Sequence, residues 1–332
     1  MHPFTLERPR DVATAMMLGA RGAPATEYIA GGTDMLPLLK DEVLRPERLV
    51  AVGAGVLDDR IELGRDGTLR IGAAARMTDV ADHEGVGETF PLIAQALLAG
   101  ASPQVRNMAT LGGNLLQRTR CGYFRDVGVV ACNKRRPGSG CAAMDGDNRM
   151  HAVLGGSDQC IATHASDVAV ALVALDARLR LRSLDGERIV ALEAFHRVPG
   201  DAPQVETVLA PGELIAAIEV PAGAALARRS HYLKVRDRVS FEFALVSAAV
   251  ALDVEDGRIR MARVAMGGVG TKPWRMPRVE QALAGARCDG TAYRAAAERA
   301  TDGAVPRGRN GFKLDLMVRT LVRALEIAGG QA

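Results

Sequence analysis

The middle of the chain carries four cysteines in a stretch without a regular pattern of apolar residues. From Gly112-Gly113 to about Cys160, glycine, proline, arginine, asparagine and aspartate dominate, and neither a helical nor a strand period persists. A structureless loop of over forty residues is rare inside a compact domain unless something fixes it. The cysteines in this stretch are Cys121, Cys132, Cys141 and Cys160.

The spacing of these cysteines, C-x10-C-x8-C-x18-C, favours an iron-sulfur cluster. Structural zinc sites usually take their thiolates from close pairs, and no such pair occurs here, whereas a cubane cluster tolerates ligands spread along a wrapping loop. The loop also has an excess of basic residues, which would offset the negative charge of four thiolates. Zinc, and thiols that are unligated or form disulfides, remain alternatives at this point.

The composition excludes several classes of protein. With 332 residues, 48% of them apolar, the chain has room for two or three packed units. The net charge of +3 makes a nucleic-acid partner a poor hypothesis. The longest apolar runs, such as 168–175 and 248–252, are too short to span a membrane. The first eight residues contain no apolar signal region, so we expect synthesis in the cytoplasm.

The pattern of elements predicts an α/β start and a separate α+β end. Helices are expected at about 11–18 and 35–40, strands at 28–30 and 49–52, and a hairpin at 61–63 and 69–71. After a boundary near Pro221, strands at 231–235, 244–252 and 258–266 precede helices at about 277–284, 293–300 and 314–327. Strands followed by helices predict an antiparallel sheet with helices on one face.

Two glycine pairs and one polar turn are candidate ligand sites. Gly31-Gly32 follows a strand and precedes a helix, and Gly112-Gly113 repeats the device, so that backbone N–H groups could cradle the two phosphates of a diphosphate. The turn Thr163 to Asp167 offers hydroxyl and carboxylate groups to a ribityl chain or a flavin edge. Each signal is weak alone, because a glycine pair is more often a plain turn and Ser166 more often a plain helix cap.

Taken together, these motifs resemble those of a known family. Ala30-Gly31-Gly32-Thr33-Asp34, Ala109-Thr110-Leu111-Gly112-Gly113-Asn114, Ala165-Ser166-Asp167, Tyr232-x-Lys234 and Gly267-Gly268-Val269-x-x-Lys272-Pro273-Trp274-Arg275 resemble the FAD-binding medium subunits of the molybdenum hydroxylases, the xanthine dehydrogenase and carbon monoxide dehydrogenase family. The cysteine-bearing segment resembles that of the bacterial periplasmic aldehyde oxidoreductases, whose flavin subunit also holds a [4Fe-4S] cluster.

The resemblance implies an α+β fold in three parts. Residues 1–53 and 54–222 would form a two-part FAD-binding domain of the vanillyl-alcohol-oxidase (PCMH) type, with the [4Fe-4S] insertion at about 116–162. Residues 223–332 would form a C-terminal α+β domain of the CO dehydrogenase flavoprotein type.

The resemblance also implies which residues hold the cofactors. FAD would contact Ser166, Asp167 and Lys234 near the flavin and two segments around the diphosphate, made up of Tyr28, Ile29, Ala30, Gly31, Gly32, Thr33, Asp34, Met35 and Leu36, and of Thr110, Gly112, Gly113 and Asn114. The metal ligands would be Cys121, Cys132, Cys141 and Cys160. Because the glycine turns and the cysteines lie apart in sequence, we expect that flavin and cluster can be lost independently.

The implied function is electron transfer within a molybdenum-containing aldehyde oxidoreductase. Electrons would pass from iron-sulfur clusters to FAD and on to an external acceptor, while substrate is oxidised on a partner subunit, so the chain carries no catalytic residue for that step. The implied partners are a large molybdenum-cofactor subunit and a small [2Fe-2S] subunit. A signal-bearing partner would carry the complex to the periplasm. The alternatives are a subunit of an enzyme like hydroxybenzoyl-CoA reductase or xanthine dehydrogenase, and a non-catalytic scaffold stabilised by zinc.

Overall fold

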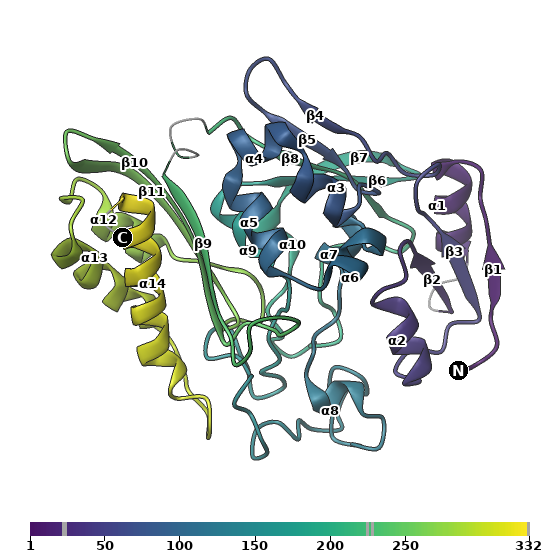
Figure 1. The fold of residues 1–332 in the computed structure, drawn as a ribbon. Helices are drawn as coiled ribbons and strands as arrows, with labels where there is room; N and C mark the ends of the chain where they lie inside the picture. The colour runs from purple at the N-terminus through teal and green to yellow at the C-terminus, as the bar shows by residue number, and fades with distance from the viewer. Residues whose placement is uncertain (22–24, 224–225, 227–228, 331–332) are drawn as a thin grey trace.

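The chain begins with a small parallel sheet flanked by two helices. The computed structural model describes residues 1–21, 25–223, 226 and 229–330. The sheet has the strand order β1-β3-β2, with both neighbouring pairs parallel. Its elements are β1 (Thr5–Glu7), α1 (Val12–Arg21), β2 (Thr26–Ile29), α2 (Met35–Lys40) and β3 (Arg48–Ala51). This unit forms one end of the molecule in Figure 1.

A five-stranded antiparallel sheet follows, with the order β4-β5-β8-β6-β7. Its strands are β4 (Ile61–Leu63), β5 (Leu69–Gly72), β6 (Arg178–Ser183), β7 (Gly186–Ala191) and β8 (Leu214–Val220). The helices of this region are α3 (Met77–Asp82), α4 (Glu84–Thr89), α5 (Pro91–Ala99), α6 (Pro103–Met108), α7 (Leu111–Leu115), α8 (Gly122–Arg125), α9 (Asp167–Ala174) and α10 (Leu192–Phe195).

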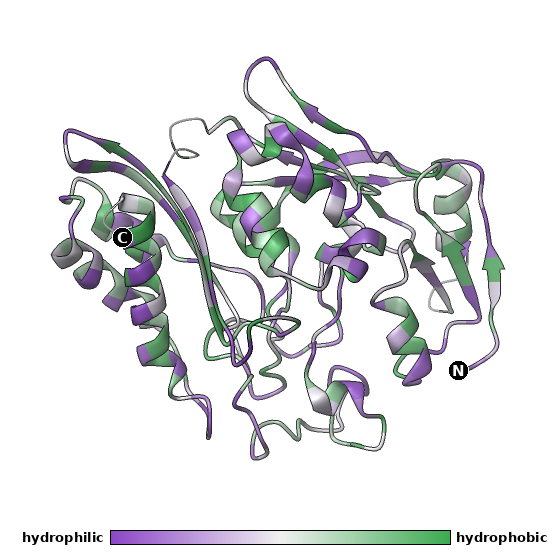
Figure 2. Ribbon diagram, viewed as in Figure 1, coloured by the Kyte–Doolittle hydropathy of each residue, from purple (hydrophilic) through white to green (hydrophobic). Residues whose placement is uncertain are grey.

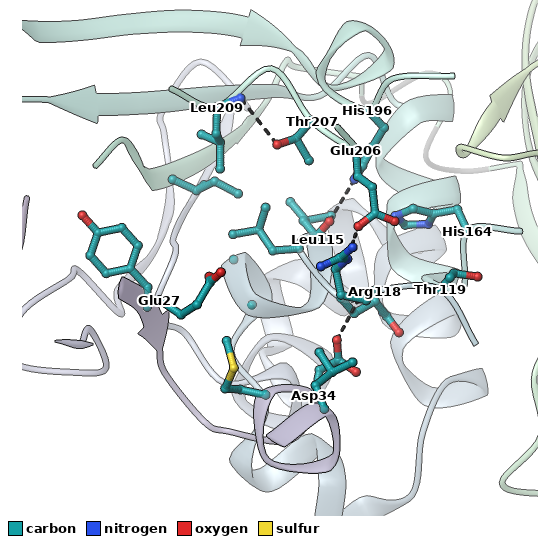
Figure 3. A pocket seen from close by; sticks show the side chains of 18 of the residues that line it. Glu27, Asp34, Leu115, Arg118, Thr119, His164, His196, Glu206, Thr207 and Leu209 are labelled. Carbon is teal, nitrogen blue, oxygen red and sulfur yellow. Dashed lines mark hydrogen bonds and ion pairs between the residues drawn. The ribbon is translucent and has the colours of Figure 1, made fainter. Parts of the chain in front are cut away.

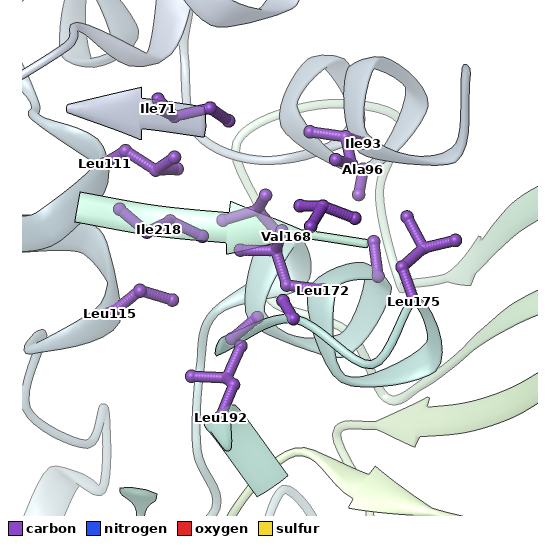
Figure 4. Packing of buried hydrophobic residues seen from close by; sticks show 14 of the residues in the cluster. Ile71, Ile93, Ala96, Leu111, Leu115, Val168, Leu172, Leu175, Leu192 and Ile218 are labelled. Carbon is purple, nitrogen blue, oxygen red and sulfur yellow. The ribbon is translucent and has the colours of Figure 1, made fainter. Parts of the chain in front are cut away.

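The main hydrophobic core lies between this sheet and its helices. Residues 168 to 174 of α9 are all buried, which is the expected position for a helix that is apolar on every side. Figure 4 shows the packing of Ile71 and Ile218 from the sheet with Leu111 from α7 and Leu172 from α9. This core gives the ligand-binding loops at its edge a rigid base.

The C-terminal part contains a four-stranded antiparallel sheet with the order β12-β11-β10-β9. Its elements are β9 (Ser230–Val235), β10 (Val246–Glu255), β11 (Arg258–Gly267), β12 (Trp274–Arg275), α12 (Pro277–Leu283), α13 (Gly290–Ala297), the 3-10 helix η1 (Glu298–Thr301) and α14 (Lys313–Gly329). Helices α12 to α14 cover one face, and α5 and α9 approach the other (Figure 1). Because both faces are covered, residues 246–252 of β10 are all buried, and apolar colouring dominates this region in Figure 2.

The cysteine-bearing segment is almost free of regular structure. Between α7 and α9 the described residues form only the short helix α8 and isolated bridges, one of which pairs Cys132 with Cys141. Hydrogen bonds from side chains replace a regular ladder: Asn133 donates to the carbonyl and side-chain oxygens of Gln159, and its own oxygen accepts from the Gly140 N–H. The segment lies at the lower edge of the molecule in Figure 1.

The expected α+β class agrees with this architecture, and the main predicted strands and helices of the C-terminal part are present. One detail differs, because the C-terminal sheet is covered on both faces rather than one. The expected domain boundary adjoins residues 224–225, which lie outside the described part of the chain, as do the last two residues. None of the described helices is both long and apolar enough to cross a membrane.

Candidate functional site

The two glycine turns pack directly against each other. A Cβ atom on Gly31 would lie 1.8 Å from the carbonyl oxygen of Met108, so only glycine permits this approach. Gly32 has a φ of +73°, a left-handed conformation that favours glycine. In the second turn, Thr110 caps α7 by accepting a hydrogen bond from the Gly113 N–H, and a Cβ on Gly112 would lie 2.9 Å from that of Ala73.

The packed turns border a cavity of about 390 Å³, which is in the usual range for a cofactor site. Figure 3 shows part of its wall, including Asp34, Arg118, His164 and Glu206. Most of the residues expected at the diphosphate line this cavity: Tyr28, Ile29, Ala30, Gly31, Gly32, Thr33, Asp34, Met35, Thr110, Gly112 and Gly113. Leu36 and Asn114, which were expected with them, are not among the lining residues.

Ser166 and Asp167 line a second cavity of about 730 Å³, which adjoins the first at Thr163 and His164. Ser166 caps α9 through a hydrogen bond from the Ala169 N–H, so the plain capping role is present. Asp167 lies beside it at the start of the helix.

Lys234 lines neither cavity. Its ammonium group is 2.8 Å from the Asp167 carboxylate and also donates to the carbonyl oxygen of Ala99, and its side chain is almost fully buried. Tyr232 donates its hydroxyl to the other oxygen of Asp167 at 2.7 Å. Lys234, which was expected near the flavin ring, therefore joins β9 to α9 in this structure.

Asp34 is fully engaged by the cysteine-bearing segment. Its carboxylate accepts from the backbone N–H of Arg118 at 2.7 Å and from the side chains of Arg120 and Arg125 at 2.9 and 2.8 Å. This carboxylate would repel a diphosphate if it were bare, and the three donors offset that charge.

Several lining residues carry no sequence signal. Glu206 forms ion pairs with Arg118 and Lys134, and these side chains close one wall of the first cavity. Sequence analysis missed Glu206 and His196 as site residues, because the loop 196–207 has no recognisable motif and approaches 115–119 only through the tertiary fold. It assigned Arg118 and Lys134 only to the excess of basic residues in the cysteine-bearing segment. His164 was expected in the polar turn 163–167 and, because it and His151 flank Cys160, as an alternative metal ligand.

Two buried histidines give this cavity unsatisfied polar atoms. The rings of His164 and His196 are 4.4 Å apart between centroids, and burial lowers the pKa of both, to about 4 for His196. His196 Nε2 donates to the Leu115 carbonyl at 2.8 Å, which leaves Nδ1 as an acceptor. His164 Nδ1 accepts from the Ser166 N–H, which leaves Nε2–H as a donor.

Within the described residues, neither His164 Nε2 nor His196 Nδ1 makes a hydrogen bond. Buried polar groups usually have partners, so a free donor and a free acceptor on one cavity wall fit a polar ligand such as a flavin nucleotide.

The four expected metal ligands line a single small cavity together with His151. The described residues contain no three His, Cys, Asp or Glu side chains drawn together tightly enough to hold a metal ion, and the thiols are instead distributed around the cavity wall. Burial raises the pKa of Cys121 to about 12 and also raises that of Cys160, so a bound cation would have to displace their protons. The donor set, two buried and two half-buried thiols on the wall of one space, fits a cluster.

Several basic side chains of the loop have partners of their own. Arg135 donates to the carbonyl oxygens of Tyr123, Phe124 and Val129, and Arg125 pairs with Asp34. These cations therefore hold the loop together through contacts with backbone carbonyls and with Asp34.

The thiol cavity adjoins the first cavity directly. Lys134, Cys160 and Ala162 line both. The expectation that the two sites are independent, which rested on their distance in sequence, does not take this shared wall into account. A change at the thiols therefore lies next to the wall of the first cavity.

Comparison with known families gives two matches that together span nearly the whole chain. Residues 2–223 match the family model described as the FAD binding domain in molybdopterin dehydrogenase. Residues 230–328 match the model described as the CO dehydrogenase flavoprotein C-terminal domain.

Individual relatives extend this result. The chain is 47% identical to the aldehyde oxidoreductase FAD-binding subunit PaoB of Escherichia coli over 334 aligned residues, which cover all of both chains. It is 25% identical to the carbon monoxide dehydrogenase medium chain of Afipia carboxidovorans, with 99% of this chain and 98% of the relative covered.

Among solved structures, a Cu,Mo-CO dehydrogenase chain superposes with a TM-score of 0.78 at 23% identity over 100% of both chains, which shows the shared fold. A chain of quinoline 2-oxidoreductase from Pseudomonas putida 86 superposes with a TM-score of 0.76 at 25% identity, covering 100% of this chain and 99% of that one.

Proposed function

Because the chain belongs to the family of FAD-binding medium subunits of molybdenum hydroxylases, we propose that it is the electron-transfer subunit of an aldehyde oxidoreductase. In this role its FAD receives electrons from iron-sulfur centres and passes them to an external acceptor. The aldehyde assignment is supported by the 47% identity over the full length of a subunit with that name. Substrate oxidation itself takes place on a partner.

FAD is held between the two glycine turns and the loop that carries His196 and Glu206. The first turn, in which Gly32 is left-handed, brings the chain close to the diphosphate. The first three N–H groups of α7 already donate to Ala75, Ala73 and Thr110, so the second turn contributes close packing of the backbone. The histidine pair supplies one donor and one acceptor to a polar edge of the nucleotide. When bound, the flavin supplies a carrier that exchanges one or two electrons.

We further propose that Cys121, Cys132, Cys141 and Cys160 hold a [4Fe-4S] cluster. All four thiols line one buried space, which suits a cofactor that binds four thiolates. The observation that carries the whole proposal is the wall shared by the two cavities, at Lys134, Cys160 and Ala162. Redox groups held in these two cavities would be separated by this shared wall, across which an electron could pass.

The partners we propose are a large subunit with the molybdenum cofactor and a small subunit with [2Fe-2S] clusters. Relatives of this chain are described as subunits or medium chains, so the family works in multi-subunit enzymes. We also propose that the assembled complex is exported to the periplasm on the signal of a partner. Fractionation of the native host tests that location.

Cofactor analysis after anaerobic purification tests the proposed function. We expect one FAD and about four irons per chain, with the broad absorbance of a cluster beneath the flavin spectrum. A protein that contains FAD but no iron would contradict the proposed cluster and support the assignment as a flavoprotein. Zinc in place of both would support the scaffold alternative and contradict the proposal.

A further inference from the structure

The imidazole ring of His151 lies against one of the four thiols. Its Nε2 atom is 3.2 Å from Sγ of Cys121, and the residue is only 6% exposed. The other ring nitrogen, Nδ1, is buried and has no hydrogen-bond partner among the described residues. Among the described residues that line the thiol cavity, His151 is the one histidine, and its ring nitrogen contacts a cysteine sulfur.

The backbone around His151 is held by the C-terminal part of the chain. Asn310, which is fully buried, donates its side-chain amide to the carbonyl oxygens of His151 and Ala152 at 3.4 and 3.2 Å. The backbone N–H of Arg309 donates to the side chain of Asn148 at 2.8 Å, and the His151 N–H donates to the Asn148 carbonyl at 2.9 Å. These contacts hold the His151 backbone in place beside the thiol cavity.

We propose that His151 donates an N–H···S hydrogen bond to the Cys121 thiolate and thereby raises the reduction potential of the cluster. The inference rests on the proposed [4Fe-4S] cluster and adds to it a residue that adjusts its potential. His151 is a positioning and tuning residue in this account, not a ligand.

The chemistry of the pair fixes the direction of donation. A thiolate bound to iron carries no proton and can only accept, so Nε2 must bear the hydrogen. That arrangement leaves Nδ1 as an acceptor, and no described residue donates to it. The second shell of a metal site commonly orients and tunes its ligands in this way.

The same hydrogen bond has a predictable effect on the potential. Reduction adds one negative charge to the cluster and its thiolates, and hydrogen bonds to a more negative sulfur are stronger. The N–H group therefore stabilises the reduced state more than the oxidised state, and hydrogen bonds to sulfur are one of the factors that set cluster potentials.

Two substitutions separate donation from packing. His151→Met removes the N–H at similar length, and His151→Gln keeps an amide donor. EPR-monitored redox titration of the full chain should show the equilibrium constant for reduction falling about tenfold in His151→Met, a shift of about 59 mV for one electron. The shift in His151→Gln should be less than half as large.

Tyr123→Phe is the packing control. The Tyr123 ring lies 6.1 Å from that of His151 between centroids, and its hydroxyl accepts from the Asp147 N–H rather than contacting sulfur. The reduction potential of the cluster in Tyr123→Phe should equal that in the wild type. Equal potentials in wild type, His151→Met and His151→Gln, at full iron content, would overturn the inference.

A measurement on the wild type covers the case in which His151→Met fails to assemble a cluster. Pulsed EPR of the reduced protein, labelled with 15N-histidine, should show one weakly coupled imidazole nitrogen. No coupling would overturn the inference, and a strong coupling would also do so, because it would mean direct ligation by histidine. Wild-type protein without iron would instead contradict the proposed function itself.

Discussion

The carboxylate of Asp34 lies 2.8 Å from a guanidinium nitrogen of Arg125, although 91 positions separate them in the chain. Both side chains are more than four-fifths buried. Asp34 belongs to the first glycine turn and Arg125 to α8, between the first two cysteines of the irregular segment. The pair therefore connects the wall of the first cavity to the segment that carries the thiols.

Asp34→Asn should weaken this connection. The amide can still accept from the Arg118 N–H, but the charge that pairs with Arg125 and Arg120 is lost, and two largely buried cations remain without it. We expect the free energy of unfolding to fall by about 2 kcal/mol, between the values for exposed and buried ion pairs. Urea unfolding, with flavin and iron content measured on the same samples, checks this, and both contents should fall together.

Asp237→Asn is the matched control for that substitution. Asp237 forms a bidentate pair with Arg149 at 2.7 and 2.9 Å, but the carboxylate is 49% exposed. The expected loss is below about 1 kcal/mol because solvent screens the pair. Equal losses in the two variants would show that the Asp34 pair has no special structural role.

Gly31→Ala should damage the first cavity through sterics alone. The added methyl would lie 1.8 Å from the Met108 carbonyl oxygen, so the two glycine turns would have to separate. We expect a loss of more than about 2 kcal/mol in stability and a loss of bound flavin. Gly53→Ala serves as the control, since its Cβ would meet nothing within 4 Å and should change stability by less than about 1 kcal/mol. Flavin retained in full by Gly31→Ala would contradict this account.

Sequence reasoning identified the elements whose apolar pattern is strong. Strand β10 and helix α14 were expected close to their observed positions. Burial of both faces gives β10 a continuous apolar run, and burial of one face gives α14 a helical period. Strand β1 and helix α7 were not expected. β1 has three residues and is mostly exposed, and α7 contains two glycines, so its helical conformation depends on the Thr110 cap and on the packing of Leu111 and Leu115.

The candidate site was predictable only in part for a related reason. The glycine turns have a local signature, and most of their residues line the cavity. His196 and Glu206 are in a loop whose role depends on where the fold places it, and no local pattern marks them. The sequence likewise gave no indication that Lys134 and Cys160 line both cavities, because this depends on contacts between distant segments.

Cys132→Ser should remove one of four thiolates and reduce the iron content to less than half. Because the thiol cavity shares a wall with the first cavity, we also expect weaker flavin retention, measured by gel filtration followed by FAD analysis. Cys288→Ser is the matched control. Its thiol lies 2.8 Å from the Tyr293 hydroxyl, far in sequence from the other four, and serine can keep that hydrogen bond. Iron loss in Cys288→Ser, or full iron in Cys132→Ser, would contradict the assigned ligand set.

Stability should fall in mild acid because His196 is buried as a neutral ring. Burial lowers its pKa from 6.5 to about 4, so between these values the unfolded chain binds a proton that the folded chain does not. The stabilisation is complete above pH 6.5 and is lost as the pH falls toward 4, at about 1.4 kcal/mol per pH unit for this group. His196→Gln can still donate to the Leu115 carbonyl but does not titrate, so its free energy of unfolding should fall less steeply from pH 6.5 to 4. At pH 8 the ring is neutral in both states, so the difference between the variants there reports packing alone. Parallel curves for wild type and His196→Gln across the acid range would show that this histidine does not control the acid sensitivity.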